Sequence, residues 1–206
     1  MLELYIQSFI VYFVVVDPLG NGPIFLSLTQ SQTTKEKIQT SIEAILIATV
    51  ILIAFSFIGK FILGYLSISL ASFRIAGGLI LFIIALEMLF NKRQQRKEQI
   101  VNDAKEKVSI FPLAIPILSG PAAITSVIVI MSEFGDNFIK QFVSIASLVS
   151  VMTITLIFFV IISKSGEFIN KKFINVFSRV IAIILAALSV QYIIDGILEV
   201  FFKGIN

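Results

Sequence analysis

Six long apolar stretches occupy most of the 206-residue chain and constrain its fold more than any other feature. They lie near residues 2–30, 39–59, 70–90, 110–132, 140–163 and 176–202. A helix needs about 20 apolar residues to cross the hydrocarbon core of a bilayer, and these stretches meet that length. Lipid offers no partner to an unpaired backbone group, and no alternating barrel pattern is present, so the spans are expected to be helical. The sequence therefore predicts an all-α membrane protein with six transmembrane helices in one domain, residues 1–206.

The composition supports this class and excludes several kinds of chemistry. Hydrophobic residues make up 57% of the chain and charged residues 14%, whereas a soluble domain carries roughly a quarter charged residues. The chain has no Cys and no His, which excludes thiolate nucleophiles, iron–sulfur clusters, zinc–thiolate sites and imidazole bases. We expect no catalytic residues, no metal, no cofactor and no enzymatic activity. The net charge of +3 is explained by basic membrane loops, so no nucleic-acid partner is expected.

The basic residues indicate how the spans are oriented. Six spans place both termini on one side, and 12 of the 16 Lys and Arg residues then fall on the other side. These twelve are Lys35, Lys37, Lys92, Arg93, Arg96, Lys97, Lys105, Lys107, Lys164, Lys171, Lys172 and Arg179, which leaves Lys60, Arg74, Lys140 and Lys203. Basic loops favour the cytoplasm, so both termini are predicted to lie outside a cell (inner) membrane. If the first and fourth spans were re-entrant hairpins, the split would fall to 10 against 6.

An internal repeat divides the chain into two halves. Residues 18–23 (PLGNGP) match residues 116–121 (PILSGP) with a difference of 98 in residue number. A second match relates Arg74 and Glu87 to Arg179 and Gln191. The halves are residues 1–90 and 110–206, joined by a cytoplasmic linker at 91–109. Three spans in each half make the repeat inverted, and inverted repeats with broken helices are typical of secondary transporters.

The repeated motif predicts a helix break near the membrane centre in spans one and four. Its prolines are Pro18, Pro23, Pro116 and Pro121. Proline removes a backbone donor and disfavours helix at the residue before it, so the first helix should stop near Val16 or Asp17. Asn21 or Ser119 is then expected to cap a new helix that begins at Pro23 or Pro121. Unpaired N–H groups at these helix starts would bind a carboxylate or another small anion. The predicted solute-binding residues are Asp17, Gly20, Asn21, Gly22, Ser119 and Gly120.

Asp17 has no acidic counterpart in the second half, where Ile115 stands at the matching position. A lone carboxylate inside a membrane costs roughly 3 kcal/mol unless it is hydrated, protonated or paired. Two functional roles are open, which are binding an ammonium group and carrying a proton. The structural alternative is a helix cap for the N–H groups of Asn21 and Gly22. An acid beside carboxylate-binding helix starts would suit a zwitterion, such as an amino acid.

Glu87 and Gln191 are predicted to take part in gating or coupling. Glu87 lies near the cytoplasmic end of the third span, and Gln191 is its neutral counterpart in the sixth span. The alternative for Glu87 is that its side chain extends to interfacial water without a functional role.

Five motifs together resemble the MarC family of bacterial and archaeal inner-membrane proteins. They are DPLGN at 17–21, RIAGG at 74–78, ALEM at 85–88, FPLAIP at 111–116 and SGP at 119–121. The resemblance covers essentially the whole chain and implies a six-helix inner-membrane protein. Some members of the family are described as transporters of small neutral amino acids such as glycine and alanine, the SnatA type. The resemblance thus implies an amino-acid substrate, as the zwitterion argument does.

The leading functional hypothesis is therefore a secondary transporter of a small neutral amino acid or similar zwitterion, working by alternating access. Coupling to a proton or to sodium remains open, as does a homo-oligomeric state. The partners expected are the solute and the lipid bilayer. The alternatives are a non-transporting assembly factor or subunit and an exporter of another small solute.

Overall fold

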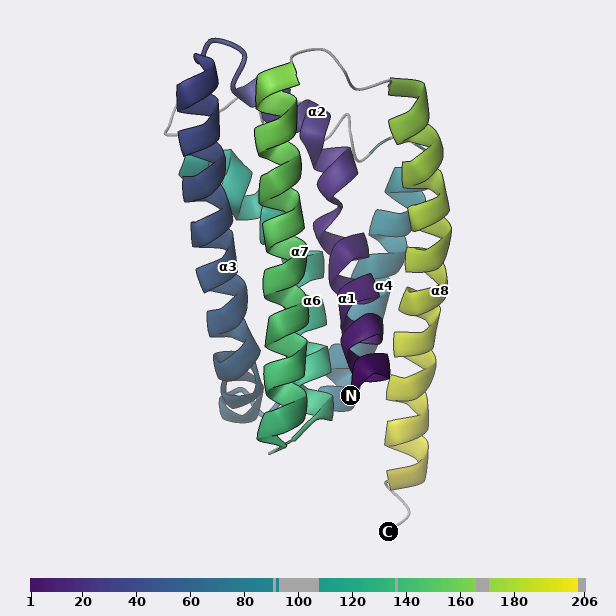
Figure 1. Cartoon of the computed structure of the whole chain (residues 1–206). Coiled ribbons are helices and arrows are strands. Elements are labelled where there is room, and N and C mark those ends of the chain that lie inside the picture. The colour runs from purple at the N-terminus through teal and green to yellow at the C-terminus, as the bar shows by residue number, and fades with distance from the viewer. Residues whose placement is uncertain (91, 93–107, 136, 166–170, 204–206) are drawn as a thin grey trace.

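The computed structural model describes residues 1–90, 92, 108–135, 137–165 and 171–203, and in that part of the chain the regular structure is entirely helical (Figure 1). Most of the predicted linker at 91–109 lies outside the described residues. The elements are α1 (Leu2–Val16), α2 (Pro18–Leu28), α3 (Thr34–Tyr65), α4 (Leu70–Leu89), η1 (Ser109–Leu118), α6 (Pro121–Glu133), α7 (Phe138–Ser165) and α8 (Lys171–Lys203). The all-α prediction is confirmed for these residues.

Five helical segments are long and apolar enough to cross a membrane. They are Leu2–Leu28, Thr34–Tyr65, Leu70–Leu89, Phe138–Ser165 and Val176–Phe201. The pair formed by η1 and α6 is bent by 56° and passes the same test only when the two are taken together as one broken segment. The described residues therefore contain five candidate spans, or six if that bent pair crosses the membrane once.

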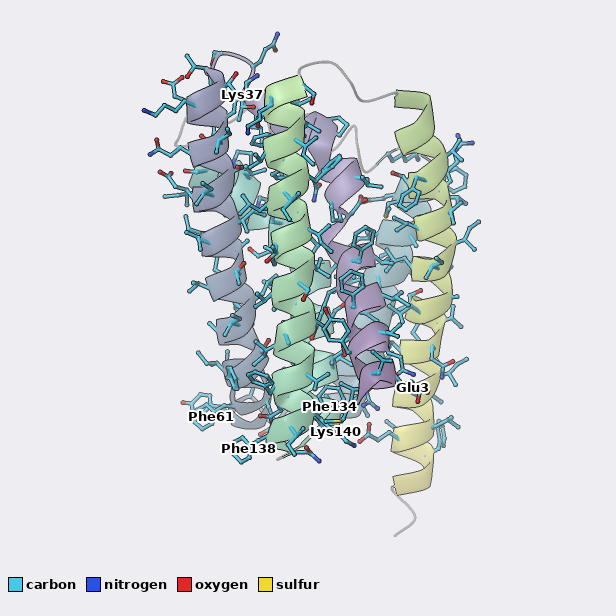
Figure 2. The ribbon with its side chains drawn as sticks, viewed as in Figure 1. Glu3, Lys37, Phe61, Phe134, Phe138 and Lys140 are labelled. Atoms are coloured by element: carbon cyan, nitrogen blue, oxygen red, sulfur yellow. The ribbon has the colours of Figure 1, made fainter. Side chains whose placement is uncertain are left out.

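The helices run alternately up and down the bundle. In Figure 1, α1 and α2 run upward from the N-terminus, α3 runs down and α4 runs up. Then η1 and α6 run down, α7 runs up and α8 runs down, so the elements of the second half run opposite to their counterparts in the first. The N-terminus and the C-terminal end of α8 lie at one end of the bundle, called here the terminal end. The opposite end, called the loop end, carries Lys37, whereas Lys140 lies at the terminal end (Figure 2).

The main helix contacts join one half of the chain to the other. Helices α1 and α2 of the first half pack on α7 and α8 of the second, while η1 and α6 of the second half pack on α3 and α4 of the first. The pairs α3–α7 and α4–α8 join the remaining helices across the halves, and α4–α8 is the most extensive contact. Each broken helix is therefore held mainly by the long helices of the other half.

The break between α1 and α2 falls at Asp17, in the interior of the bundle (Figure 1). Helix α1 ends at Val16 as expected, and Asp17 adopts a left-handed conformation with φ 53° and ψ 64°. Asp tolerates this region better than most residues do. Because Pro18 is well suited to the first helical position, α2 begins there at once. The prediction that Asn21 caps a helix starting at Pro23 is therefore wrong, since Pro23 lies inside α2.

The second break separates η1 from α6. Residues Phe111 and Ile115 are extended, as expected for residues that precede a proline, and the peptide bonds that follow them are cis. Helix α6 begins at Pro121 as predicted, but its N-cap residue is Gly120 and no side chain caps it. The prediction that Ser119 caps this helix is wrong, because Ser119 lies one residue too early.

Two glycines bring α4 and α8 close together. A Cβ atom on Gly78 would lie 2.7 Å from the carbonyl oxygen of Ser189, and one on Gly196 would lie 2.8 Å from the carbonyl oxygen of Ala71. Small residues at such crossings let backbones approach, which drives helix association where no hydrophobic effect operates. This contact explains how the fold holds the two halves together.

Replacing either glycine should therefore separate α4 from α8. We expect Gly78→Ala and Gly196→Ala each to destabilise the protein by about 1–3 kcal/mol through overpacking against backbone. The measurement is the thermal unfolding midpoint in detergent. Gly64→Ala is the matched control, because a Cβ there meets nothing within 4 Å. Equal midpoints for Gly78→Ala and Gly64→Ala would contradict this packing.

Candidate functional site

Each helix break contains a hydrogen bond from a side chain to a backbone carbonyl, and the two bonds are at matching positions. The Asn21 side-chain amide donates to the carbonyl oxygen of Val16 at 2.6 Å, and the Ser119 hydroxyl donates to the carbonyl oxygen of Ala114 at 2.8 Å. Both donors and both acceptors differ by 98 in residue number, which is the offset of the sequence repeat. Each bond satisfies a carbonyl near a point where helical pairing is interrupted, and a buried carbonyl without a partner would be costly. Asn21 and Ser119 thus have the same structural role in the two halves, which is to bond a carbonyl group at the break.

The Asp17 side chain is buried at the first break, with 3% of the residue exposed. Its Oδ1 accepts a hydrogen bond from the backbone N–H of Gly20 at 3.1 Å. A Cβ on Gly20 would run into this carboxylate, so the cap needs glycine at that position. Asp17 therefore acts as a helix cap, although toward Gly20 and not toward Asn21 and Gly22. Its predicted roles with an ammonium group or a proton remain predictions.

The sequence predicts that the backbone N–H groups of Asn21 and Gly22 bind a solute, but in the structure both groups lie within helix α2. The Asn21 N–H donates to the carbonyl oxygen of Asp17, and Gly22 is the fifth residue of α2, where the N–H belongs to the helical ladder. Gly22 faces α7 instead, since a Cβ there would lie 2.7 Å from the ring of Phe158. The early start of α2 at Pro18 is the physical reason for this correction.

The start of α6 differs from the start of α2, because no side chain caps it. Its first residue, Pro121, has no N–H, and the next two, Ala122 and Ala123, are 4% and 2% exposed. Gly120 is held close to the carbonyl oxygen of Pro116. The first turn of a helix carries unpaired N–H groups and a partial positive charge. Of the two predicted helix starts, this one offers backbone donors to a ligand.

Glu87 and Gln191 lie far apart along the bundle. Gly78 packs against α8 at Ser189 and Ile193, so Gln191 lies near the level of Gly78. Glu87 is nine residues further along α4, about 13 Å at 1.5 Å per residue. Glu87 is half-buried, while Gln191 is exposed and donates to Asp195 at 2.7 Å. The structure does not bring these two residues to one site, and their gating roles remain predictions.

An ion-pair network that sequence reasoning missed lies at the terminal end. Arg74 of α4 pairs with Glu133 of α6 at 2.9 Å and with Glu199 of α8 at 3.1 Å. The side chains of Arg74 and Glu199 are 13% and 18% exposed, and that of Glu133 is 38% exposed. The sequence offered one signal, an arginine and two glutamates near helix ends, but nothing local indicated that three separate helices meet there. The Arg74–Glu199 pair joins the two halves of the chain.

A polar cavity of about 420 Å³ opens between the start of α3 and the start of η1. It is lined by Gln32, Glu36, Gln39, Thr40, Glu43, Val108 and Ser109. The Ser109 hydroxyl donates to Glu43 at 2.9 Å, which links η1 to α3. Among the described residues, no group of three or more His, Cys, Asp and Glu side chains is arranged to hold a metal ion.

Apolar helices of spanning length, with two segments broken by proline inside the bundle, define a multi-span integral membrane protein. A family model described as "MarC family integral membrane protein" matches residues 2–201. The chain belongs to the MarC family.

Its relatives include two archaeal proteins and one bacterial protein. It is 33% identical to UPF0056 membrane protein MJ0972 of Methanocaldococcus jannaschii, over 98% of this chain and 90% of the relative. It is 34% identical to UPF0056 membrane protein MJ1677 of the same organism, over 95% of this chain and 97% of the relative. It is also 32% identical to UPF0056 membrane protein YhcE of Escherichia coli, over 96% of this chain and 93% of the relative. No solved structure matches the chain.

The Arg74 network makes a testable contribution to stability. Arg74→Gln would remove the cation that Glu133 and Glu199 share, and we expect a loss of about 1–3 kcal/mol, a modest value because both acids are partly solvated. Arg179→Gln is the control, since Arg179 is the repeat counterpart of Arg74 and is exposed. Thermal unfolding in detergent should show a lower midpoint for the first variant only. A midpoint for Arg74→Gln that equals that of Arg179→Gln would show that the ion pairs contribute nothing.

Proposed function

We propose that the protein is a secondary transporter that moves small neutral amino acids, or similar small zwitterions, across the cell membrane. The observation that supports the proposal is the pair of helix breaks at matching positions. The first contains the buried Asn21–Val16 hydrogen bond, and the second contains the buried Ser119–Ala114 hydrogen bond. Discontinuous helices at matching positions of two halves are the usual place for a solute site in such transporters. The relatives are named only as membrane proteins, and their names give no transported solute.

The proposal includes six spans arranged as two inverted repeats. The packing supports it, because the main contacts of the broken helices have counterparts when the halves are exchanged. The repeat relates α1 to η1 and α2 to α6, so the contact of α1 with α7 corresponds to that of η1 with α3. Likewise α2 with α7 corresponds to α6 with α3, and α2 with α8 corresponds to α6 with α4. Opposite running directions of the matching elements support the inversion.

The solute class follows from the charges at the breaks. The uncapped start of α6 offers N–H donors and a partial positive charge, which suit a carboxylate. Asp17, at the end of α1, offers a negative charge for an ammonium group. An amino acid carries both groups on one carbon atom. Proton or sodium coupling is compatible with Asp17 and the neighbouring carbonyl groups.

The packing of the halves also bears on how alternating access would occur. Movement of residues 1–90 against residues 110–206 would break most helix contacts, because those contacts join the halves. We propose instead that one moving body contains α1, α2, α7 and α8, and the other contains η1, α6, α3 and α4. This grouping keeps the contacts of each broken helix with the long helices of the other half, and the movement would occur along the contact of α4 with α8, the most extensive in the fold, and that of α3 with α7.

The orientation is proposed from the basic residues. The loop end carries Lys35, Lys37 and Lys164, so it would face the cytoplasm and both termini would lie outside. The cavity between α3 and η1 would then open toward the cytoplasm. Labelling of single cysteines at Lys35 and Lys140 from each side of the membrane checks this orientation in a chain without native cysteine.

Counterflow in proteoliposomes tests the function. Liposomes loaded with unlabelled glycine or alanine should accumulate the labelled amino acid, and Asp17→Asn should reduce the initial rate at least about tenfold, because the amide can still accept the Gly20 bond but carries no charge. Glu3→Gln is the control, an exposed acid at the start of the same helix. Absence of counterflow with any small amino acid would contradict the proposal, and full activity of Asp17→Asn would remove Asp17 from the site.

A further inference from the structure

In the described chain the hydroxyl oxygens of Ser126 and Ser132, both in α6, are shielded from solvent and have no hydrogen-bond partner, and of these two residues Ser126 is fully buried. Several buried hydroxyls elsewhere in the helices donate to the carbonyl four residues earlier, as Ser56 does to Leu52, Thr155 to Val151 and Ser163 to Phe159. Ser126 makes no such bond to Ala122. A buried polar group without a partner is costly, and in native proteins it usually marks a water, an ion or a ligand.

The position of Ser126 in α6 places its side chain beside the uncapped helix start. Side chains in a helix lean toward its N-terminus and cover the preceding turn. The turn before Ser126 contains Ala122 and Ala123, whose N–H groups lie in the first turn of α6 and are capped by no side chain. The hydroxyl and these two N–H groups therefore converge on the same part of the helix.

The face of α6 that carries Ser126 is distinct from its faces toward α3 and α4. Thr125 contacts Gly77 of α4, and Ile128 contacts Gly59 of α3. Successive residues of a helix are turned by about 100°, so Ser126 points about 100° away from Thr125 and about 160° away from Ile128. Helix α1, which ends at Val16 beside Asp17, also packs on α6, and α7 makes a smaller contact with it. Ser126 thus lies on a part of α6 that faces away from α3 and α4.

We propose that Ser126 is a solute-binding residue and that its hydroxyl, with the N–H groups of Ala122 and Ala123, binds the solute carboxylate. This inference rests on the proposed transport function and makes the site asymmetric. The start of α2 is capped by Asp17 and takes no carboxylate, whereas the start of α6 takes it. Three neutral donors and a helix N-terminus can hold a monoanionic carboxylate without a basic side chain.

Binding of glycine and of glycinamide to the purified protein tests the assignment. Glycinamide keeps the ammonium group and lacks the carboxylate. We expect Ser126→Ala to weaken glycine binding about five- to tenfold, the loss of one hydrogen bond, and to leave glycinamide binding unchanged. Ser126→Thr keeps the hydroxyl and should retain glycine affinity. Ser56→Ala is the control, a buried serine bonded within its own helix.

The unfolding midpoint separates a binding role from a structural one. A hydroxyl without a partner contributes no hydrogen bond to the folded protein, so Ser126→Ala should have the same midpoint as the wild type or a higher one. A midpoint lower by several degrees would mean that the hydroxyl is bonded within the protein, and would overturn the proposal. So would equal glycine affinity in Ser126→Ala and Ser56→Ala. If the wild type bound no amino acid at all, the proposed function itself would fail.

Discussion

Every backbone group inside this apolar bundle needs a partner, and the prolines of the two breaks remove partners from helical pairing. A local hydrogen bond supplies a partner at each break, from the Asn21 side chain to the Val16 carbonyl and from the Ser119 hydroxyl to the Ala114 carbonyl. These bonds give the carbonyl groups of Val16 and Ala114 a partner. They also place the polar side chains of Asn21 and Ser119 in the interior of a membrane protein. The interrupted segments are then held between long apolar helices of the opposite half. The candidate site exists because the fold keeps the hydrogen-bonded groups of these interruptions, Asn21 and Ser119 with their acceptors, buried among the helices.

The breaks differ in one respect that matters for function. At the first break Asp17 closes one helix and opens the next, and its carboxylate occupies the N-terminal donor that a ligand would need. At the second break Ile115 stands where an acid could have done so, and Gly120 has no side chain to cap α6. One break therefore carries a carboxyl group and the other carries backbone donors that no side chain caps. That combination favours a solute with two opposite charges close together.

Local sequence predicted much of this architecture, and its limits have physical reasons. The proline-glycine motif predicted both breaks, the end of α1 at Val16 and the start of α6 at Pro121. It missed the start of α2, because a left-handed Asp17 allows the helix to resume at Pro18 within one residue. The partners of Arg74 and the packing of each broken helix on the other half could not be predicted. They depend on contacts between residues far apart in the chain, for which a single sequence carries no local signal.

The proposed site predicts that a solute carboxylate binds on the first turn of α6. Solid-state NMR can test it directly, by measuring dipolar dephasing of carboxyl-labelled ¹³C-glycine bound to protein labelled with ¹⁵N-alanine. We expect strong dephasing that survives substitution of other buried alanines and is lost when Ala122 and Ala123 are both replaced by unlabelled residues. Bound glycine whose carboxyl carbon shows no dephasing from these two amides would contradict it.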